Sequence, residues 1–278
     1  MMLNRDTPEV KNWIRDALAD NNLNMYQVEG YSVNNESVTG IFERLNLVKN
    51  IKELNQSDIN QIIINLIISE KSEWLAKYQL STELGVPLFL ILWHCTDEEF
   101  MVCQILFESD EPSCKQLNMF NSCYELAVWL GDFKGITVTK KFIEPGRLSY
   151  IDECLRKNGV PWPGNLDSFW CDNNLKQILA IFEFSRTRKT PVMAHDVNRY
   201  FRQDIYRWKP LDILRKQINV PLFLILWSTD EDIIKFQEIK DIDYKTNSGL
   251  KYESTMIIER TELINFFNEL LVKLSMKD

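Results

Sequence analysis

The sequence predicts an α/β protein built from two similar units, each a small mixed β-sheet flanked by helices. The octapeptide Val-Pro-Leu-Phe-Leu-Ile-Leu-Trp occurs twice, at 86–93 and at 220–227. Both copies are apolar throughout, which is typical of a strand covered on both faces and therefore of a sheet with helices on each side. The copies begin 134 residues apart (86 and 220), a domain-sized period that favours a tandem duplication over a solenoid.

The elements around the octapeptide follow the same order in both halves. An amphipathic pattern predicts an opening helix, and an alternating apolar run after each octapeptide predicts a further strand. A helical pattern then closes each half. The predicted pairs are opening helices at 8–20 and 149–157, strands at 100–107 and 233–239, and closing helices at 122–130 and 261–274.

A comparison of the segments before the two octapeptides places 61–69 over 177–185. In this register Ile67 takes the place of Glu183, so the first half is expected to lack the acid that the second half carries. A Pro-Gly pair at 145–146 marks a boundary. We therefore predict a degenerate unit at 1–144 and a unit with the candidate site at 147–278.

Composition excludes several classes of protein. The 278 residues carry a net charge of −8 and are 45% hydrophobic, which is enough for a packed core. No run of eighteen apolar residues occurs and the N-terminus does not resemble a signal peptide, so we expect a cytoplasmic protein without a membrane partner. Six scattered cysteines and only two histidines favour reduced thiols over a disulfide scaffold or a zinc site. Glycine-rich phosphate loops and a Gly-x-Ser-x-Gly motif are absent.

Two acids stand in otherwise apolar strands of the second half. The predicted strands are 165–171 and 177–185, joined by an Asp-Asn-Asn turn, and they carry Asp167 and Glu183. Burying a carboxylate without a partner costs several kcal/mol, so a divalent cation between the two acids is one interpretation. The alternative has Asp167 as an acid near a turn and Glu183 in an ion pair with Arg186 or Arg188.

A basic segment follows the second acid. Between 186 and 216 the chain has nine Lys or Arg residues against three Asp residues, with four aromatic residues interspersed. Such a pattern suits a surface that follows phosphates and stacks on bases. The alternative is a solvated amphipathic helix, predicted at 195–217 with a break at Pro210. Asp196 is expected to cap this helix, and His195 is either a phosphate contact or a surface residue.

The second half resembles the PD-(D/E)XK nucleases, the restriction-endonuclease-like superfamily. The resemblance rests on the order of an opening helix, Asp167, Glu183-Phe-Ser, a basic helix and an apolar strand, with the two acids 16 positions apart. Glu153 on the opening helix stands where several members keep an extra acid. Ser185 takes the place of the family's lysine.

The resemblance implies a site that holds Mg²⁺ or Mn²⁺ between Asp167 and Glu183, with the Phe184 carbonyl as a further ligand. Such a metal would polarise a phosphodiester and activate water. The implied catalytic residues are Asp167, Glu183, Ser185, Glu153 and Lys189. Lys189 is included because it, Arg186 or Arg188 would replace the missing lysine. The implied nucleic-acid contacts are Arg186, Arg188, Lys189, His195, Arg199, Arg202, Arg207 and Lys209.

Two functions follow from this interpretation. The first is a metal-dependent nuclease, or a nuclease-derived subunit, that acts on DNA or RNA. The resemblance also implies a role in defence against mobile elements, where this superfamily is often found. The second is a catalytically inactive scaffold or adaptor in a larger nucleic-acid-processing complex, which the missing lysine and the acidic net charge favour. Either function implies nucleic acid as a partner, together with a protein partner or a second copy of the chain.

Overall fold

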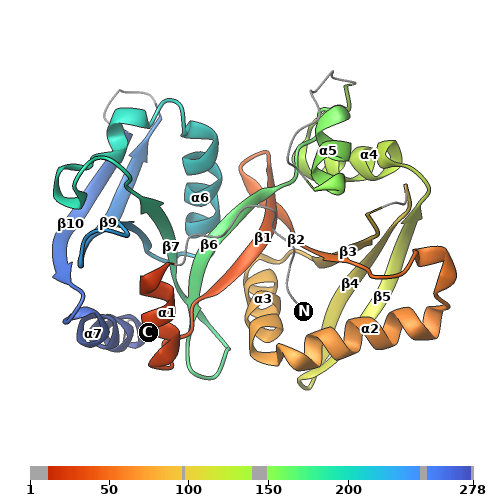
Figure 1. The fold of residues 1–278 in the computed structure, drawn as a ribbon, viewed down its shortest axis with the longest axis horizontal. Coiled ribbons are helices and arrows are strands. Elements are labelled where there is room, and N and C mark those ends of the chain that lie inside the picture. Colours follow the sequence, from red (N-terminus) through yellow and green to blue (C-terminus); the bar gives the residue numbers. More distant parts are fainter. Residues whose placement is uncertain (1–11, 96–97, 140–148, 245–248, 277–278) are drawn as a thin grey trace. The chain divides into compact units, whose positions relative to one another are not determined.

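The computed structural model describes residues 12–95, 98–139, 149–244 and 249–276. These residues form two compact units (Figure 1). Unit 1 is Val28–Asn165, and unit 2 combines 12–27 with 166–276. Helix α1 (Trp13–Asp20) therefore belongs to unit 2 and helix α5 (Tyr150–Lys157) to unit 1. The predicted division at 144–147 instead keeps each of these helices with the strands that follow it.

Unit 1 is a five-stranded mixed sheet with helices on both faces. The strands follow the order β1-β2-β3-β4-β5, and β2 and β3 are parallel while the other described pairs are antiparallel. Its elements are β1 (Tyr26–Asn34), β2 (Ser37–Asn46), α2 (Gln56–Ser69), α3 (Lys71–Leu84), β3 (Leu88–Trp93), β4 (Phe100–Glu108), β5 (Glu111–Phe120), α4 (Cys123–Lys134) and α5.

Unit 2 has the same order of strands and the same directions. The order is β6-β7-β8-β9-β10, and β7 and β8 are parallel. Its elements are α1, β6 (Gly164–Cys171), β7 (Ile178–Arg186), two short 3-10 helices (Val192–Ala194 and Val197–Tyr200), α6 (Ile205–Gln217), β8 (Leu222–Trp227), β9 (Ile233–Asp243), β10 (Gly249–Glu259) and α7 (Leu263–Ser275).

The two identical strands β3 and β8 explain why each sheet carries two helical layers. Every residue of both strands is buried, and alternate side chains point to opposite faces. Phe89, Ile91 and Trp93 of β3 pack in one core with α4 and α5. Residues at the same positions of β8 pack with α1 and α7, which lie side by side in Figure 1. The remaining leucines face the opposite layer, which contains α3 in unit 1 and α6 in unit 2.

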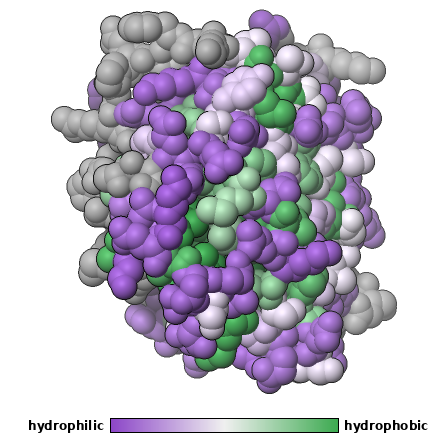
Figure 2. All heavy atoms as spheres, turned by 90° about the vertical axis from the view of Figure 1, so that its right-hand side faces the viewer, coloured by the Kyte–Doolittle hydropathy of each residue, from purple (hydrophilic) through white to green (hydrophobic). Residues whose placement is uncertain are grey.

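Most of the predicted elements are confirmed. The strands at 165–171 and 177–185 are β6 and β7, the two octapeptides form β3 and β8, and the opening and closing helices are present. Residues 8–11 of the first helix lie outside the described residues. No residue ranges were predicted for strands β1, β2, β5 and β10. Strand β5 is exposed along much of its length. The face that Figure 2 shows mixes hydrophilic with hydrophobic residues.

Two predictions about local structure are wrong. Residues 61–69 lie in helix α2, where Ile59, Ile63 and Ile67 are buried at the four-residue spacing of a helix face, so they do not correspond to strand β7. The predicted helix at 195–217 is helical only from Ile205, after two 3-10 helices, and it continues through Pro210.

None of the helices in the described ranges is long and apolar enough to span a membrane.

A disulfide joins Cys123 at the start of α4 to Cys154 of α5, both within unit 1. The prediction that the thiols are reduced is therefore wrong for this pair. The cysteines are separated by 31 residues in sequence and come together because α4 and α5 pack on the same face of the sheet. Cys95, Cys103, Cys114 and Cys171 form no disulfide.

Candidate functional site

Asp167 and Glu183 lie on the same face of the unit 2 sheet. Ser168 of β6 pairs with Phe182 of β7, and continuing this antiparallel register places Asp167 opposite Glu183. Glu183 pairs with Leu224 of β8, whose side chain points away from the α1 and α7 layer. Glu183 is therefore directed toward α6 and is only 1% exposed. The sequence prediction that the two acids come together is consistent with this geometry.

A guanidinium occupies the space between the two acids. Nη2 of Arg207, in the first turn of α6, contacts Glu183 Oε1 and lies 3.3 Å from Asp167 Oδ2. The same nitrogen donates to the Phe184 carbonyl at 3.3 Å. Asp167 Oδ2 also accepts a hydrogen bond of 3.1 Å from the Phe184 amide. One arginine nitrogen thus contacts the three oxygens that the nuclease resemblance assigns to a metal.

Arg207 is not the ion-pair partner that the sequence predicts for Glu183. Arg186 instead donates to Thr229 Oγ1 at 3.3 Å and lies over the Trp227 ring. Arg188 is exposed in the segment after β7. Arg186 does not pair with Glu183 because side chains alternate along β7: the two residues are three positions apart and therefore point to opposite faces of the sheet.

Arg15 of helix α1 is a second cation at the site, and sequence analysis missed it. Its Nη2 donates to the backbone carbonyl of Asp167, and its Nη1 donates to Gln27 Oε1 at 3.2 Å. Its guanidinium carbon lies 4.9 Å from the centroid of the Phe184 ring, a cation–π contact. No local sequence signal could identify this residue, because 152 positions separate it from Asp167.

The remaining predicted catalytic residues are dispersed. Ser185 is half-buried on β7, one residue beyond Phe184, and Lys189 is exposed. Glu153 lies on α5 in unit 1, with its carboxylate 4.0 Å from Lys157 Nζ. Glu153 therefore belongs to a different unit from Asp167 and Glu183.

Of the predicted nucleic-acid contacts, Arg199, Arg202, Arg207 and Lys209 lie between the second 3-10 helix and the first two turns of α6. Tyr200 and Tyr206 are exposed, the latter by 89%. His195 is half-buried, and burial together with the charge of Lys235 lowers its pKa. Asp196 caps the second 3-10 helix by accepting from the Asn198 amide. We define the basic ridge as the exposed residues Arg199, Tyr200, Arg202, Tyr206 and Lys209.

Unit 1 carries an acid pair that sequence analysis missed. Glu43 pairs with Leu90, the third residue of β3, and Glu183 pairs with the third residue of β8. Gly30 pairs with Phe42, so continuing the register places Glu29 opposite Glu43. The prediction that the first half lacks the acids is therefore wrong. The signal was the shared tripeptide Ile-Phe-Glu at 41–43 and 181–183.

Cations also neutralise the unit 1 acids. Lys77 Nζ of α3 lies 3.0 Å from Glu43 Oε2 and 2.8 Å from Glu73 Oε1. Arg44 Nε lies 3.3 Å from Glu29 Oε2, and its Nη1 lies 2.9 Å from Asp152 Oδ1 of α5. The side chains of Lys77 and Glu43 are only 5% and 7% exposed.

Burial and pairing shift the pKa values of the unit 1 pair. Burial raises the pKa of Glu43 to about 7, against the opposing attraction of Lys77. Burial alone would lower the pKa of Lys77, but Glu43 and Glu73 outweigh it and raise that pKa above its ordinary value. The ammonium therefore remains charged at neutral pH.

The cations come from corresponding helices, one turn apart. Trp74 of α3 and Trp208 of α6 each precede their identical strand by 14 residues, counted to Leu88 and Leu222. Arg207 therefore corresponds to Glu73, and Lys77 lies one helical turn further along. Each buried glutamate thus faces a cation from the helix before the identical strand, although the cation occupies a different helical position.

The oxygens around Arg207 are of the type that Mg²⁺ prefers, but they do not fit a metal while the guanidinium lies among them. Within the described ranges no cluster of three or more His, Cys, Asp or Glu residues could hold a metal ion. Comparisons with protein-family models, curated proteins and solved structures find no match to this chain.

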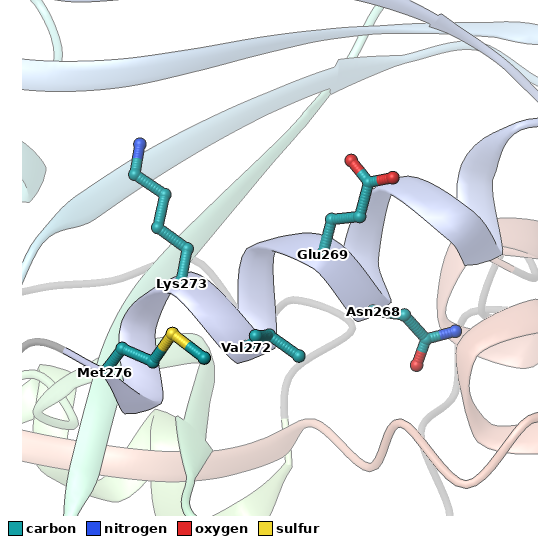
Figure 3. A pocket seen from close by; sticks show the side chains of 5 residues that line it. All are labelled: Asn268, Glu269, Val272, Lys273 and Met276. Atoms are coloured by element: carbon teal, nitrogen blue, oxygen red, sulfur yellow. The ribbon is translucent and has the colours of Figure 1, made fainter.

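A shallow hollow of about 500 Å³ lies on α7 (Figure 3). It is lined by Asn268, Glu269, Val272, Lys273 and Met276, with Glu269 and Lys273 on one side of the helix. None of the acid-pair residues lines it.

Proposed function

We propose that this protein is a nuclease-derived, catalytically inactive subunit of a nucleic-acid-processing complex, built by duplication of a restriction-endonuclease-like unit. Duplication is supported by the octapeptide, by the corresponding registers of Glu43 and Glu183, and by the same strand order in both units.

One observation carries the inactive assignment: Arg207 Nη2 contacts Glu183, Asp167 and the Phe184 carbonyl together. A divalent cation placed there would have to expel the guanidinium and would then repel it at short range. Mg²⁺ also keeps several waters when bound, and a glutamate that is 1% exposed leaves little room for them. Ser185 supplies no charge in place of the lysine that would stabilise the reaction.

The basic ridge supports nucleic acid as the partner. The three cations and two exposed tyrosines of the ridge lie within the eleven positions 199–209, which also contain Arg207 and one acid, Asp204, in a chain whose net charge is −8. Exposed tyrosines provide stacking surfaces for bases, and nearby cations attract phosphates.

An active metal-dependent nuclease is the second candidate. It is favoured by the convergence of two carboxylates and a carbonyl on one point, and by the exposure of Arg207, whose side chain is 43% accessible and has room to move. For this function Arg207 would leave the acids before a metal binds.

Cleavage assays distinguish the two functions. Purified full-length protein is incubated with single-stranded and duplex DNA and RNA in Mg²⁺ or Mn²⁺, alongside Glu183→Gln as the matched control. We expect no cleavage above that of Glu183→Gln with any substrate. Cleavage by the wild type that Glu183→Gln abolishes, with folding retained, would establish the nuclease instead.

A further inference from the structure

The opening helices α1 and α5 carry opposite charges at the same position. Arg15 is the third residue after the N-cap Asn12, and Asp152 is the third residue after the N-cap Ser149. Both caps accept a hydrogen bond from a backbone amide of the first turn, so the two helices begin in the same way. The side chains at this position therefore leave corresponding places on the two helices.

The residues that receive these side chains also correspond. Phe184 pairs with Ile225 and Arg44 pairs with Ile91, and each isoleucine is the fourth residue of its identical strand. Arg15 lies over the Phe184 ring in unit 2, whereas Asp152 forms a 2.9 Å ion pair with Arg44 in unit 1. Each helix thus meets the partner that suits its charge.

The opposite assignment of helices would be unfavourable at both places. If α1 joined unit 1, Arg15 would face Arg44, and if α5 joined unit 2, Asp152 would face the Phe184 ring and the backbone carbonyl oxygen of Asp167. Like charges at contact distance are destabilising, and Asp152 would lose its ion pair in exchange for an aromatic ring. Both mismatches therefore act in the same direction.

We infer that Arg15 and Asp152 specify which unit each opening helix joins, and that Arg15 is in this way a positioning residue for the Asp167 strand. The two helices are otherwise similar apolar elements: Ile14 and Leu18 of α1 are fully buried in the unit 2 core, and Ile151 and Leu155 of α5 are fully buried in the unit 1 core. Apolar contacts of this kind do not discriminate strongly between two similar sheets. Charge supplies the discrimination.

Neighbouring contacts hold each helix once it is assigned. Trp13 Nε1 donates to the Ser228 carbonyl at 2.9 Å in unit 2, and Arg260 lies 4.8 Å from a Trp13 ring centroid. In unit 1 the disulfide between Cys154 and Cys123 fastens α5 to α4. The disulfide is a convenient reporter, because Cys154 reaches Cys123 only when α5 is seated in unit 1.

The test measures the fraction of Cys123–Cys154 disulfide in a glutathione redox buffer, by alkylation and mass spectrometry of the full chain. Asp152→Arg places a second cation beside Arg44, and we expect the linked fraction to fall several-fold. Asp152→Arg combined with Arg44→Gln removes the like-charge contact without placing an acid beside Glu29, and should recover most of the linked fraction. Asp152→Asn, a neutral variant of similar size, should be intermediate.

Hydrogen exchange of α1 provides the measurement for unit 2. Arg15→Asp should accelerate amide exchange in 13–20 at least several-fold, whereas Arg15→Lys, which keeps the charge, should change it little. If Asp152→Arg alone prevents folding, recovery of folding in its combination with Arg44→Gln still supports the inference. A wild-type linked fraction in Asp152→Arg, or no recovery in the combination, would overturn it.

Discussion

Glu43 and Glu183 occupy the same position against two identical strands, because each pairs with the third residue of Leu-Phe-Leu-Ile-Leu-Trp. Each glutamate is buried beside a cation from the helix that precedes its identical strand. In unit 1 the cation is Lys77, and in unit 2 it is Arg207. Because these helical positions are one turn apart, the cation is supplied independently in each unit. A charge opposite the buried glutamate is therefore a shared requirement of both sheets.

Arg207→Ala should destabilise the protein by about 1–3 kcal/mol, because it leaves Glu183 buried without a cation; the exposure of Arg207 reduces the loss from the full value of a buried pair. Urea denaturation measures the change. Lys209→Ala, an exposed control in the same helix, should stay within about 0.5 kcal/mol of the wild type. Arg207→Ala with Glu183→Gln should be more stable than Arg207→Ala alone, and equal stability would argue against the pairing.

Lys77→Ala should cost more, about 3–5 kcal/mol, because both Lys77 and Glu43 are almost completely buried. Lys71→Ala in the exposed first turn of α3 is the control. Replacing both partners, with Lys77→Met and Glu43→Leu, should recover much of the stability because no charge is left buried. A loss for Lys77→Ala no larger than that for Lys71→Ala would show that the pair contributes nothing.

The raised pKa of Glu43 predicts a stability that falls with rising pH. The folded-state pKa is about 7 against an unfolded value of 4.5, so the folded protein holds the proton more tightly between these values. Stability should therefore decrease from about pH 4.5 to about pH 7, by up to ~3 kcal/mol, and then level off as far as this group is concerned. Melting curves of wild type and Glu43→Gln test this. Parallel pH profiles would contradict it.

Reversing charges on the basic ridge should weaken binding to nucleic acid. Arg199→Glu with Lys209→Glu should reduce the affinity for a fluorescent single-stranded oligonucleotide at least tenfold and flatten its salt dependence, because fewer counterions are released. Tyr206→Ala should weaken binding with little effect on the salt dependence, since stacking is not ionic. Lys71→Glu, in unit 1, is the control. Equal effects of the ridge and control variants would exclude the ridge as the binding surface.

Local pattern was sufficient to predict most of the fold. The apolar runs identified β6, β7, β3 and β8, and amphipathic spacing identified the opening and closing helices. The Ile-rich segment 61–69 was misassigned because a short apolar run suits both a buried strand and a helix. Strand β5 was missed because none of its residues is buried, so its sequence has no apolar run that marks a strand.

The candidate site was predictable only in part. Asp167 and Glu183 stood out as acids in apolar strands, whereas their partners depend on which helix covers which face of the sheet. Arg207 was grouped with the phosphate contacts because it lies in the basic segment 186–216. Arg15 contacts Asp167 because α1 packs in unit 2. No local pattern in the sequence indicates that contact.

Arg207 occupies the position between Asp167 and Glu183 that a divalent metal ion would take, and a titration with Mn²⁺ followed by isothermal calorimetry tests this most directly. The wild type should bind no Mn²⁺ with a dissociation constant in the low millimolar range or tighter. Arg207→Ala should gain one such site, and adding Glu183→Gln to this variant should remove it. Binding of Mn²⁺ by the wild type with such a dissociation constant, lost in Glu183→Gln, would contradict the account.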